Sequence, residues 1–519
     1  MNLALSSCRI CGSDRIRFVR ELDSILPGEK RRYLLCEKCE TLMDEAGIPP
    51  EYRTASPVDV SSPAVKFYLQ VGCGIASIAT GILLGTRVLE AMGTNGKRCF
   101  LDVGACMGHS LSLAQMLGYQ STGIEPSSLG RIGQELFGVK IFENYLAEVD
   151  FPKNSFDLIH ASEVIEHVQD PKSFMDSLVR YLKADGVMIL TTPNSEAAVA
   201  GEAIEKEWYE LFSPGSHMNL FSSASVRLLL NRSGLRYVQV IASGGTSKKK
   251  RLWILGSNNP KMNRGLIPDL IKIEKESQDL TTQWLQSILG ICESKKDFGI
   301  LYEGTLYRLF DYFMGRGIYE KAHVLSQKLN ETLEKSSNGA FEKMNRIESI
   351  GFEDYLSHVP AFAGLYLYLK GFLNLNYLGK YAEAFENFNQ AEHLLRLEES
   401  MVYYRSARVG WPADARFKQG IARLHAGSQD EALAIFKQLL DSKAYRDMPD
   451  QGKEIWFYKG VSHFYKQEDL KAISNLIRHM TKRPFSGAST RQSFNYLMKT
   501  IAKLSQNLTK SIWTRRPSH

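Results

Sequence analysis

Short apolar runs alternate with helical spacers between residues 98 and 193, and this alternation constrains the fold more than any other feature. The run RCFLDVG (98–104) indicates a buried strand. Four further runs follow it, mostly with helical spacers between them: YQSTGIEP (119–126), VKIF (139–142), FDLIHA (156–161) and GVMILTTP (186–193). Strands that alternate with helices form a parallel sheet covered on both faces. LRYVQVIAS and RLWILGS then lie close together, as in an antiparallel hairpin. We expect an α/β fold, a doubly wound sheet that closes on a hairpin.

The first strand-to-helix turn, LDVGACMGHS, carries residues suited to a ribose-containing ligand. Asp102, Gly104 and Gly108 form D-x-G-x-x-x-G, in which glycines let the backbone approach a ligand closely. Glu125 ends the second strand, 23 residues after Asp102, and could bind both hydroxyls of a ribose. Ligands of doubly wound sheets bind at the carboxyl ends of the strands. A second glycine-rich stretch, VGCGIAS (71–77), has no strand before it, and we exclude it as a cofactor site.

Taken together, LDVGACMGHS, GIEPS, FDLIHASEVIEHVQDP and GVMILTTPN resemble class I S-adenosylmethionine-dependent methyltransferases over residues 95 to 258. The resemblance implies a Rossmann-like seven-stranded sheet that binds S-adenosylmethionine, with the ribose on Glu125 and the adenine near Leu146 and Ala161. The cofactor-binding residues that it implies are Asp102, Gly104, Ala105, Gly108, Glu125, Leu146 and Ala161. A dinucleotide-binding oxidoreductase is the structural alternative, and the FDLIHASEVIEH segment and the closing hairpin argue against it.

The stretch HASEVIEHVQDP places Glu163, Glu166 and His167 at positions i, i+3 and i+4. On one helical turn these side chains would converge, and two close carboxylates repel unless a positive group, such as a divalent cation, lies between them. With His217 downstream, the pattern resembles ubiquinone-biosynthesis O-methyltransferases and the enzymes that methylate the 2′-hydroxyl at small-RNA 3′ ends. That resemblance implies Glu163, Glu166, His167 and His217 as ligands of one divalent ion, Mg²⁺ or another, that orients a substrate hydroxyl.

The same residues have a second interpretation that needs no metal. EVIEHV is common across methyltransferases of many substrates, where the Glu can face outward and the His can pack against the next helix. In that case His217 or His167 would be the general base, because imidazole titrates near neutral pH. The catalytic candidates are therefore His217, His167 and Glu166. Asp170 and Pro171 are an N-cap and a first helical residue.

Four cysteines near the start form two knuckles, Cys8-x-x-Cys11 and Cys36-x-x-Cys39, with 24 residues between them. Four thiolates can surround one zinc ion tetrahedrally, and such a closed site is structural rather than catalytic. Two unrelated pairs or a disulfide framework are the alternative, which a reducing cytoplasm disfavours. We expect a zinc-binding module at residues 1–50, a linker and leading helix at 51–94, and the methyltransferase domain at 95–260.

A zinc module joined to this type of methyltransferase resembles the sugar C-methyltransferases that act on nucleotide-linked deoxysugars. In that family a Tyr and a Glu-His pair near the FS segment assist carbanion chemistry. Here Ser216 precedes His217, and SPG stands where the Tyr would be expected. We therefore expect O-methylation of a sugar hydroxyl in a glycan or nucleotide-sugar precursor, in polysaccharide biosynthesis.

Three segments between about 360 and 485 align on one another, with small residues at matching places. Gly420, Ala432 and Phe436 recur as Gly460, Ala472 and Leu476, and as Gly371, Ala384 and Phe388 with one extra residue. Small residues there let two antiparallel helices pack closely. The segments resemble tetratricopeptide repeats, and a degenerate unit around 315–329 precedes them. We expect an all-α helical-repeat domain at 261–519, which either docks a peptide or polymer or only covers the methyltransferase.

Length, charge and hydropathy set the remaining expectations. A chain of 519 residues is too long for one core. Its net charge of +7 is small, and the basic spots SKKKR (247–251) and TRRPSH (514–519) lack interleaved aromatic residues, so no specific nucleic acid is predicted. The longest apolar stretch, residues 71–85, is shorter than the roughly 20 residues of a membrane span and indicates a buried helix. No signal peptide is evident at the start, and we expect a cytoplasmic protein.

The leading expectation is an S-adenosylmethionine-dependent methyltransferase with a small-molecule or glycan substrate and a protein partner on its repeats. Two other classes stay open. One is an RNA or protein methyltransferase that docks its substrate on the helical repeats. The other is a non-catalytic scaffold that binds the cofactor.

Overall fold

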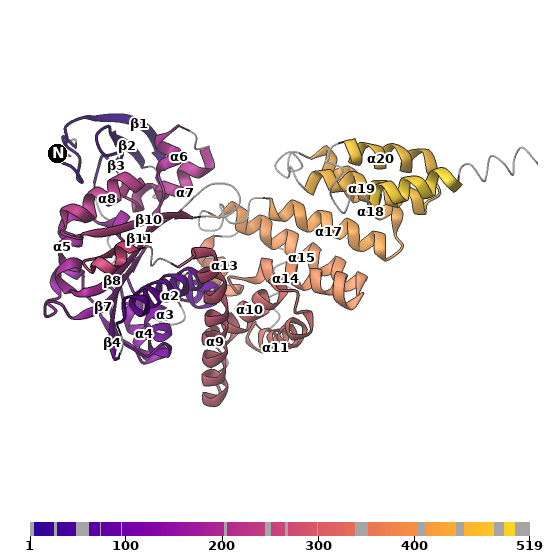
Figure 1. Cartoon of the computed structure of the whole chain (residues 1–519). Helices are drawn as coiled ribbons and strands as arrows, with labels where there is room; N and C mark the ends of the chain where they lie inside the picture. The colour runs from indigo at the N-terminus through magenta and orange to yellow at the C-terminus, as the bar shows by residue number, and fades with distance from the viewer. Residues whose placement is uncertain are drawn as a thin grey trace, which may run out of the picture. The chain divides into compact units, whose positions relative to one another are not determined.

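The computed structural model describes residues 5–24, 29–47, 62–72, 74–94, 96–201, 205–243, 251–264, 268–297, 299–337, 351–401, 410–442, 451–481 and 492–503. They divide into two compact units, Met1–Lys295 and Lys296–His519. Residues 51–61 of the predicted linker, the lysines of SKKKR and the TRRPSH end lie outside the described residues. Figure 1 shows the elements of both units.

The first unit is built on a seven-stranded sheet with the order β10-β11-β8-β7-β4-β5-β6. Its strands are β4 (Arg98–Val103), β5 (Tyr119–Ile124), β6 (Lys140–Phe142), β7 (Phe156–Ser162), β8 (Leu182–Pro193), β10 (Tyr237–Ser243) and β11 (Arg251–Ser257). The strands from β4 to β8 pair in parallel, whereas β10 and β11 form the antiparallel hairpin that closes the sheet. The predicted doubly wound sheet is confirmed.

One face of the sheet is covered by α2 (Ile75–Met92), a helix of high apolar content. Gly81 and Gly85 let it approach closely, since a Cβ on Gly85 would lie 2.4 Å from Leu158 Cδ1. Within the described residues α2 alone is long and apolar enough to cross a membrane, and 67% of it is buried. That burial agrees with the buried helix expected from the sequence.

A further helix, α9 (Leu270–Lys295), packs on α2 and belongs to the first unit. Thr80 Oγ1 lies 2.7 Å from Ser277 Oγ, and Trp284 donates its Nε1–H to Ser112 Oγ at 3.0 Å. From the sequence alone, this helix falls within the C-terminal domain expected at 261–519. An amphipathic helix shows that it buries a face but not which unit it covers, so the boundary between the units lies near residue 295.

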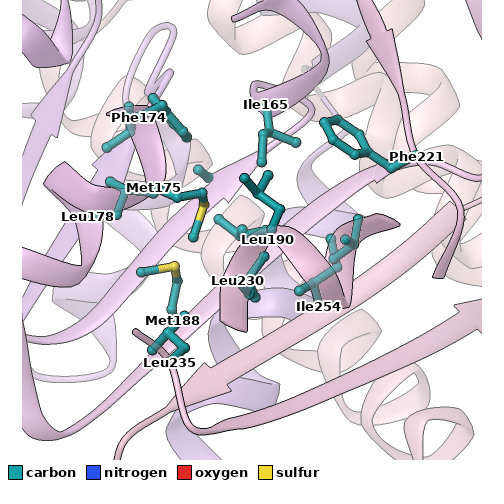
Figure 2. Close-up of a cluster of buried hydrophobic side chains, with 14 of the residues drawn as sticks. Ile165, Phe174, Met175, Leu178, Met188, Leu190, Phe221, Leu230, Leu235 and Ile254 are labelled. Carbon is teal, nitrogen blue, oxygen red and sulfur yellow. The ribbon is translucent and has the colours of Figure 1, made fainter. Parts of the chain in front are cut away.

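The opposite face of the sheet holds a large hydrophobic cluster, beneath α5 (Pro171–Tyr181) and α8 (Ser223–Arg232). Figure 2 shows Met175 and Leu178 of α5 pointing toward Met188 and Leu190 of β8, with Leu230 nearby. Each fully buried side chain of this kind contributes roughly 1.5–3 kcal/mol. The cluster also includes residues that flank the E-x-x-E-H segment, so the packing of this core helps to position that segment.

The N-terminal module shares its sheet with the rest of the unit. Its strands are β1 (Ile16–Asp23), β2 (Lys30–Cys36) and β3 (Leu42–Asp44), and the fourth strand of this antiparallel sheet is β9 (Asn219–Leu220). Tyr33 packs on Phe212 of α7 (Glu205–Ser216), with ring centroids 4.0 Å apart. The module therefore does not form a separate domain ending at residue 50.

The remaining helices of the first unit are α1 (Pro63–Phe67), η1 (Tyr68–Gly72), α3 (His109–Met116), α4 (Leu129–Phe137), η2 (Leu146–Glu148), η3 (Ile165–His167), α6 (Glu196–Val199) and η5 (Pro260–Arg264). Those of the second unit include α10 (Ile300–Gly315), α11 (Tyr319–Ser337), α13 (Phe352–His358), α14 (Ala363–Leu373), η6 (Asn374–Leu378), α15 (Tyr381–Ser400), α17 (Trp411–His425), α18 (Gln429–Asp441), α19 (Gln451–Tyr465) and α20 (Asp469–Thr481), and residues 492–503 are helical as well.

The second unit consists of helix pairs, and the aligned small residues lie where the two helices of a pair meet. A Cβ on Gly420 would lie 2.4 Å from Phe436 Cε1, and one on Gly460 would lie 2.7 Å from Leu476 Cγ. Ala432 is fully buried in the same contact. The predicted close packing of helix pairs is confirmed, and their assignment to the tetratricopeptide family stays a prediction.

Candidate functional site

The turn after β4 has the backbone geometry expected of a ligand-binding loop. Gly104 and Gly108 adopt φ angles of +78° and +73°, which favour glycine. A Cβ on Gly104 would lie 2.5 Å from Val164 Cγ2, so this position also permits close packing. Gly133 of α4 supports the loop from behind, because a Cβ there would lie 2.2 Å from Met107 O. The contact of Gly133 could not be predicted from the sequence, since no local signal marks a helical glycine as a packing position.

Glu125 lies directly after β5 and faces this loop. Its carboxylate accepts hydrogen bonds from Cys106 N at 2.9 Å and from the amide and hydroxyl of Ser127 at 2.9 and 2.7 Å. Burial raises the pKa of Glu125, and the hydrogen bonds from Ser127 and Cys106 oppose that effect. The predicted acidic strand end therefore lies beside the glycine turn, and its contact with a ribose stays a prediction.

Asp102 is buried at the end of β4 and has both carboxylate oxygens engaged within the protein. Oδ1 lies 2.7 Å from His160 Nδ1, and Oδ2 accepts a hydrogen bond from Ser110 Oγ. Asp102 thereby joins β4 to β7 and to α3. This role was not expected from the sequence, because it depends on the pairing of β4 with β7. A direct contact of Asp102 with the cofactor stays a prediction.

The residues predicted to surround the adenine are buried in the hydrophobic cluster beneath α5 and α8. Leu146 lies in η2 and Ala161 in β7, and their side chains are 7% and 1% exposed. Ala105 is also buried, in the turn after β4. The structure places all three at the carboxyl side of the sheet, and their contact with an adenine stays a prediction.

The E-x-x-E-H segment forms the short 3₁₀ turn η3 (Ile165–His167) directly after β7, rather than an α-helical turn. Glu166, His167 and His217 each offer one ligand atom, and these atoms lie within 4.8 Å of one another. Glu163 is not a member of this group. The predicted convergence therefore holds for three of the four residues, and we refer to them as the Glu-His-His cluster.

Glu166 is the buried carboxylate of the Glu-His-His cluster. Its side chain is fully buried, Oε2 accepts a hydrogen bond from Thr192 Oγ1 at 3.1 Å, and Oε1 has no hydrogen-bond partner among the described residues. Burial, and secondarily the nearby Glu163, raise the pKa of Glu166 well above its ordinary value. Two carboxylates this close favour a proton or a cation between them, and the buried Oε1 of Glu166 could bind either.

The two imidazoles of the cluster are held in one tautomer by backbone carbonyls. His167 Nδ1 donates to Ser216 O at 2.9 Å, and His217 Nδ1 donates to Leu211 O at 2.5 Å. A carbonyl can only accept, so the neutral rings carry their lone pairs on Nε2. Burial, followed by the neighbouring His217, lowers the pKa of His167 to about 4, and burial also lowers the pKa of His217. Both rings are therefore neutral near pH 7.

Glu163 interacts with Glu166 and also with two residues outside the cluster. It accepts a hydrogen bond from Thr191 Oγ1 at 2.9 Å, and its Oε1 lies 3.1 Å from Arg251 Nε. Arg251 pairs with Pro193 in the β11–β8 ladder, which brings the guanidinium to this edge of the sheet. Arg251 thus supplies a positive charge beside Glu163, and the role of Glu163 as a fourth metal ligand stays a prediction.

The four cysteines of the N-terminal module converge as predicted. One ligand atom from each of Cys8, Cys11, Cys36 and Cys39 lies within 4.8 Å of the others, and the four are free thiols rather than disulfides. The Cys8–Cys39 and Cys11–Cys36 sulfur pairs are both 3.5 Å apart. A tetrahedral Zn²⁺ with Zn–S bonds of about 2.3 Å needs sulfurs roughly 3.7–3.8 Å apart. The group is therefore compatible with zinc.

Comparison with known proteins adds a family for part of the first unit. Residues 81–240 match the sequence profile of a family described as a methyltransferase domain. A ubiquinone biosynthesis O-methyltransferase of Rhodopseudomonas palustris is 32% identical over 99 residues, which cover 18% of this chain and 39% of that protein. One from Actinobacillus pleuropneumoniae is 38% identical over 117 residues, covering 20% and 49%. The chain thus spans less than half the length of these relatives.

A solved structure from Thermotoga maritima was also found. It is a S-adenosylmethionine-dependent methyltransferase, described as a possible histamine N-methyltransferase, with 18% sequence identity and a TM-score of 0.26. The match covers 35% of this chain and 92% of that one.

Proposed function

We propose that this chain, which contains a class I S-adenosylmethionine-dependent methyltransferase domain at residues 81–240, methylates a hydroxyl oxygen of its acceptor with the help of a divalent cation. The carrying observation is the buried Glu166 Oε1, which has no hydrogen-bond partner among the described residues. It lies beside two imidazoles whose Nε2 atoms carry the lone pairs. One carboxylate and two imidazoles suit a first-row divalent cation with open positions for substrate oxygens.

The cofactor supplies an electrophilic methyl carbon, and a bound cation would lower the pKa of an acceptor hydroxyl. The residues of the chain would position the cofactor, the cation and the acceptor. Glu125 would hold the ribose beside the Gly104–Gly108 turn, while Glu166, His167 and His217 would fix the cation at the neighbouring strand end. Correct alignment of the acceptor oxygen with the methyl carbon is worth several orders of magnitude in rate.

The acceptor that fits such a site carries two neighbouring hydroxyls, both of which can reach one cation. A sugar diol and an aromatic diol share this chemistry. The sugar acceptor expected from the sequence is one such diol. Relatives named ubiquinone biosynthesis O-methyltransferase favour O-methylation without selecting the acceptor of this chain. We propose the vicinal diol as the substrate class, in a small molecule.

The test is a methyl-transfer assay with the full chain and labelled S-adenosylmethionine. The acceptors are an aromatic vicinal diol, a nucleotide sugar, total RNA and a protein fraction, each with Mn²⁺ or with a chelator. We expect label in one of the two diols, dependent on Mn²⁺, with zinc content measured to confirm that the chelator has not emptied the cysteine site. Transfer that survives chelation would contradict the cation and favour an imidazole as general base. Label only in RNA or protein would contradict the substrate class, and binding of S-adenosylhomocysteine without transfer would favour a scaffold.

We also propose that the four cysteines bind one structural zinc ion. The support is their geometry, together with an amide of the first knuckle, Ile10 N, which donates to Cys8 Sγ at 3.4 Å. The test is the zinc content of the purified protein, with Cys11→Ser compared with Cys99→Ser, a cysteine outside the group. Loss of zinc in the first variant alone is expected, and equal zinc content in both variants would contradict the proposal.

A further inference from the structure

The first cysteine knuckle carries an arginine that reaches the strand beside His217. Arg9 lies between Cys8 and Cys11, and its side chain is partly buried. Arg9 Nη1 donates to Met218 O at 3.2 Å and to Asn219 Oδ1 at 3.3 Å, and Nη2 donates to Asp44 O at 2.6 Å. Three acceptors around a planar guanidinium hold it in one orientation. Arg9 of the cysteine module is thus hydrogen-bonded to Met218, the residue that follows His217.

Met218 continues this connection to the candidate site through its main chain. Its carbonyl accepts hydrogen bonds from Arg9 and from Asp44 N, the latter at 2.9 Å, whereas its N–H donates to Glu166 O at 2.8 Å. One residue therefore joins the cysteine module on one side to a member of the Glu-His-His cluster on the other. His217 lies directly before it in the chain.

Asn219 makes a second, parallel bridge. Its Oδ1 accepts from Arg9, and its Nδ2 donates to Val168 O at 2.7 Å, directly after η3. Asn219 is fully buried, so the loss of either partner would leave one of its polar atoms buried without a hydrogen bond. Glycine at position 47 leaves room for the arrangement, since a Cβ there would lie 2.3 Å from Arg9 Nη2.

We propose that Arg9 is a positioning residue that sets the place of His217 relative to Glu166 and His167, and so couples the cysteine module to the affinity of the Glu-His-His cluster for a divalent cation. The proposal rests on the cation of the proposed function. Groups that orient metal ligands without touching the metal typically change metal affinity by about 10–100-fold when they are replaced.

The positioning can be tested without activity or metal, by hydrogen–deuterium exchange of peptides covering residues 214–222 in the full chain. Arg9→Ala removes the guanidinium, and Arg9→Lys keeps the charge but loses the fork of two nitrogens. Arg15→Ala is the matched control, because Arg15 lies in the same module, is 70% exposed and pairs only with Glu37 at 3.7 Å among the described residues. We expect about tenfold faster exchange in both Arg9 variants and none of this in the control.

Calorimetric titration then separates positioning from a general loss of structure. Mn²⁺ is the probe, because it prefers oxygen and nitrogen ligands to four thiolates. In the Arg9 variants we expect Mn²⁺ affinity to fall by about tenfold or more, while zinc content and S-adenosylhomocysteine affinity match the wild type. If affinity for Mn²⁺ and affinity for S-adenosylhomocysteine fall by the same factor, the variants are only misfolded, and that result would overturn the proposal.

The outcomes also separate this proposal from the proposed function. Exchange and Mn²⁺ affinity that match the Arg15 control would overturn the positioning role of Arg9. If the wild-type protein binds no Mn²⁺ while the Arg9 variants exchange faster, the cation of the proposed function fails and the positioning of the His217 segment stands.

Discussion

The rings of His167 and His217 lie with their centroids 4.7 Å apart and their planes at 75°, although one follows β7 and the other follows α7. Neither ring is oriented by the other, because each Nδ1 is bonded to its own backbone carbonyl. The pair is therefore fixed before any ligand arrives. Preorganisation of this kind lowers the entropy lost on binding.

Replacement of either imidazole tests this pair directly. His217→Ala and His167→Ala should each weaken Mn²⁺ binding by at least tenfold, because one of three protein ligands is lost. Affinity for S-adenosylhomocysteine should stay within about twofold. Calorimetry on the full chain measures both, with the exposed His358→Ala as the control. Equal Mn²⁺ affinity in all three variants would rule out the cluster as the cation site.

Glu125 should control cofactor affinity. A hydrogen bond to a charged group is worth about 1.5–3 kcal/mol, so Glu125→Ala should weaken S-adenosylhomocysteine binding by about 10–100-fold. Glu125→Gln keeps the shape and should lose less. Glu135→Ala, on the exposed face of α4, should match the wild type. An unchanged dissociation constant in the Glu125 variants would show that the ribose lies elsewhere.

Two helical glycines of the first unit should respond to alanine with opposite signs. At Gly133 a Cβ would meet the backbone of Met107, at 2.2 Å from its oxygen, so Gly133→Ala should destabilise by about 1–3 kcal/mol. At Gly290 in α9 an added Cβ would meet no atom within 4 Å from the described residues outside its own stretch of helix backbone, and alanine should stabilise by about 0.5–1 kcal/mol. Urea unfolding gives both values, and a similar change at the two sites would contradict the close contact of α4 with the loop.

Asp170 should make the stability of α5 depend on pH. Its carboxylate accepts from Ser173 Oγ at 2.6 Å and Ser173 N at 3.0 Å, and these bonds lower the pKa of Asp170. Because the folded-state pKa lies below the unfolded value of about 3.9, the contribution is present above that value and is lost as pH falls through the folded-state pKa. Asp170→Ala should cost about 1 kcal/mol at pH 7 and less in acid.

Unfolding at several pH values, with the exposed Asp185→Ala as the control, measures the effect. A cost for Asp170→Ala that does not change between neutral and acidic pH would show that the cap does not need its charge.

The parts of this molecule that could be predicted from the sequence are those with short-range signals. Apolar runs indicated the strands, and the spacing of the paired cysteines indicated that the four thiols meet. The glycine turn and Glu125 indicated a binding site at the carboxyl ends of two strands. The missed features depend on which elements meet. Arg251 reaches Glu163 only because β11 pairs with β8 in one register, and α9 joins the first unit only because its buried face meets α2.

The small strand β9 has a consequence for how the protein is made. A chain that grows from its N-terminus cannot finish the sheet of the cysteine module until Asn219 and Leu220 have left the ribosome. By then every strand of the parallel part of the large sheet has already been synthesised. The part of the protein that is translated first therefore completes its fold among the later parts of the unit, so nascent chains that stop before residue 219 would carry an unfinished module.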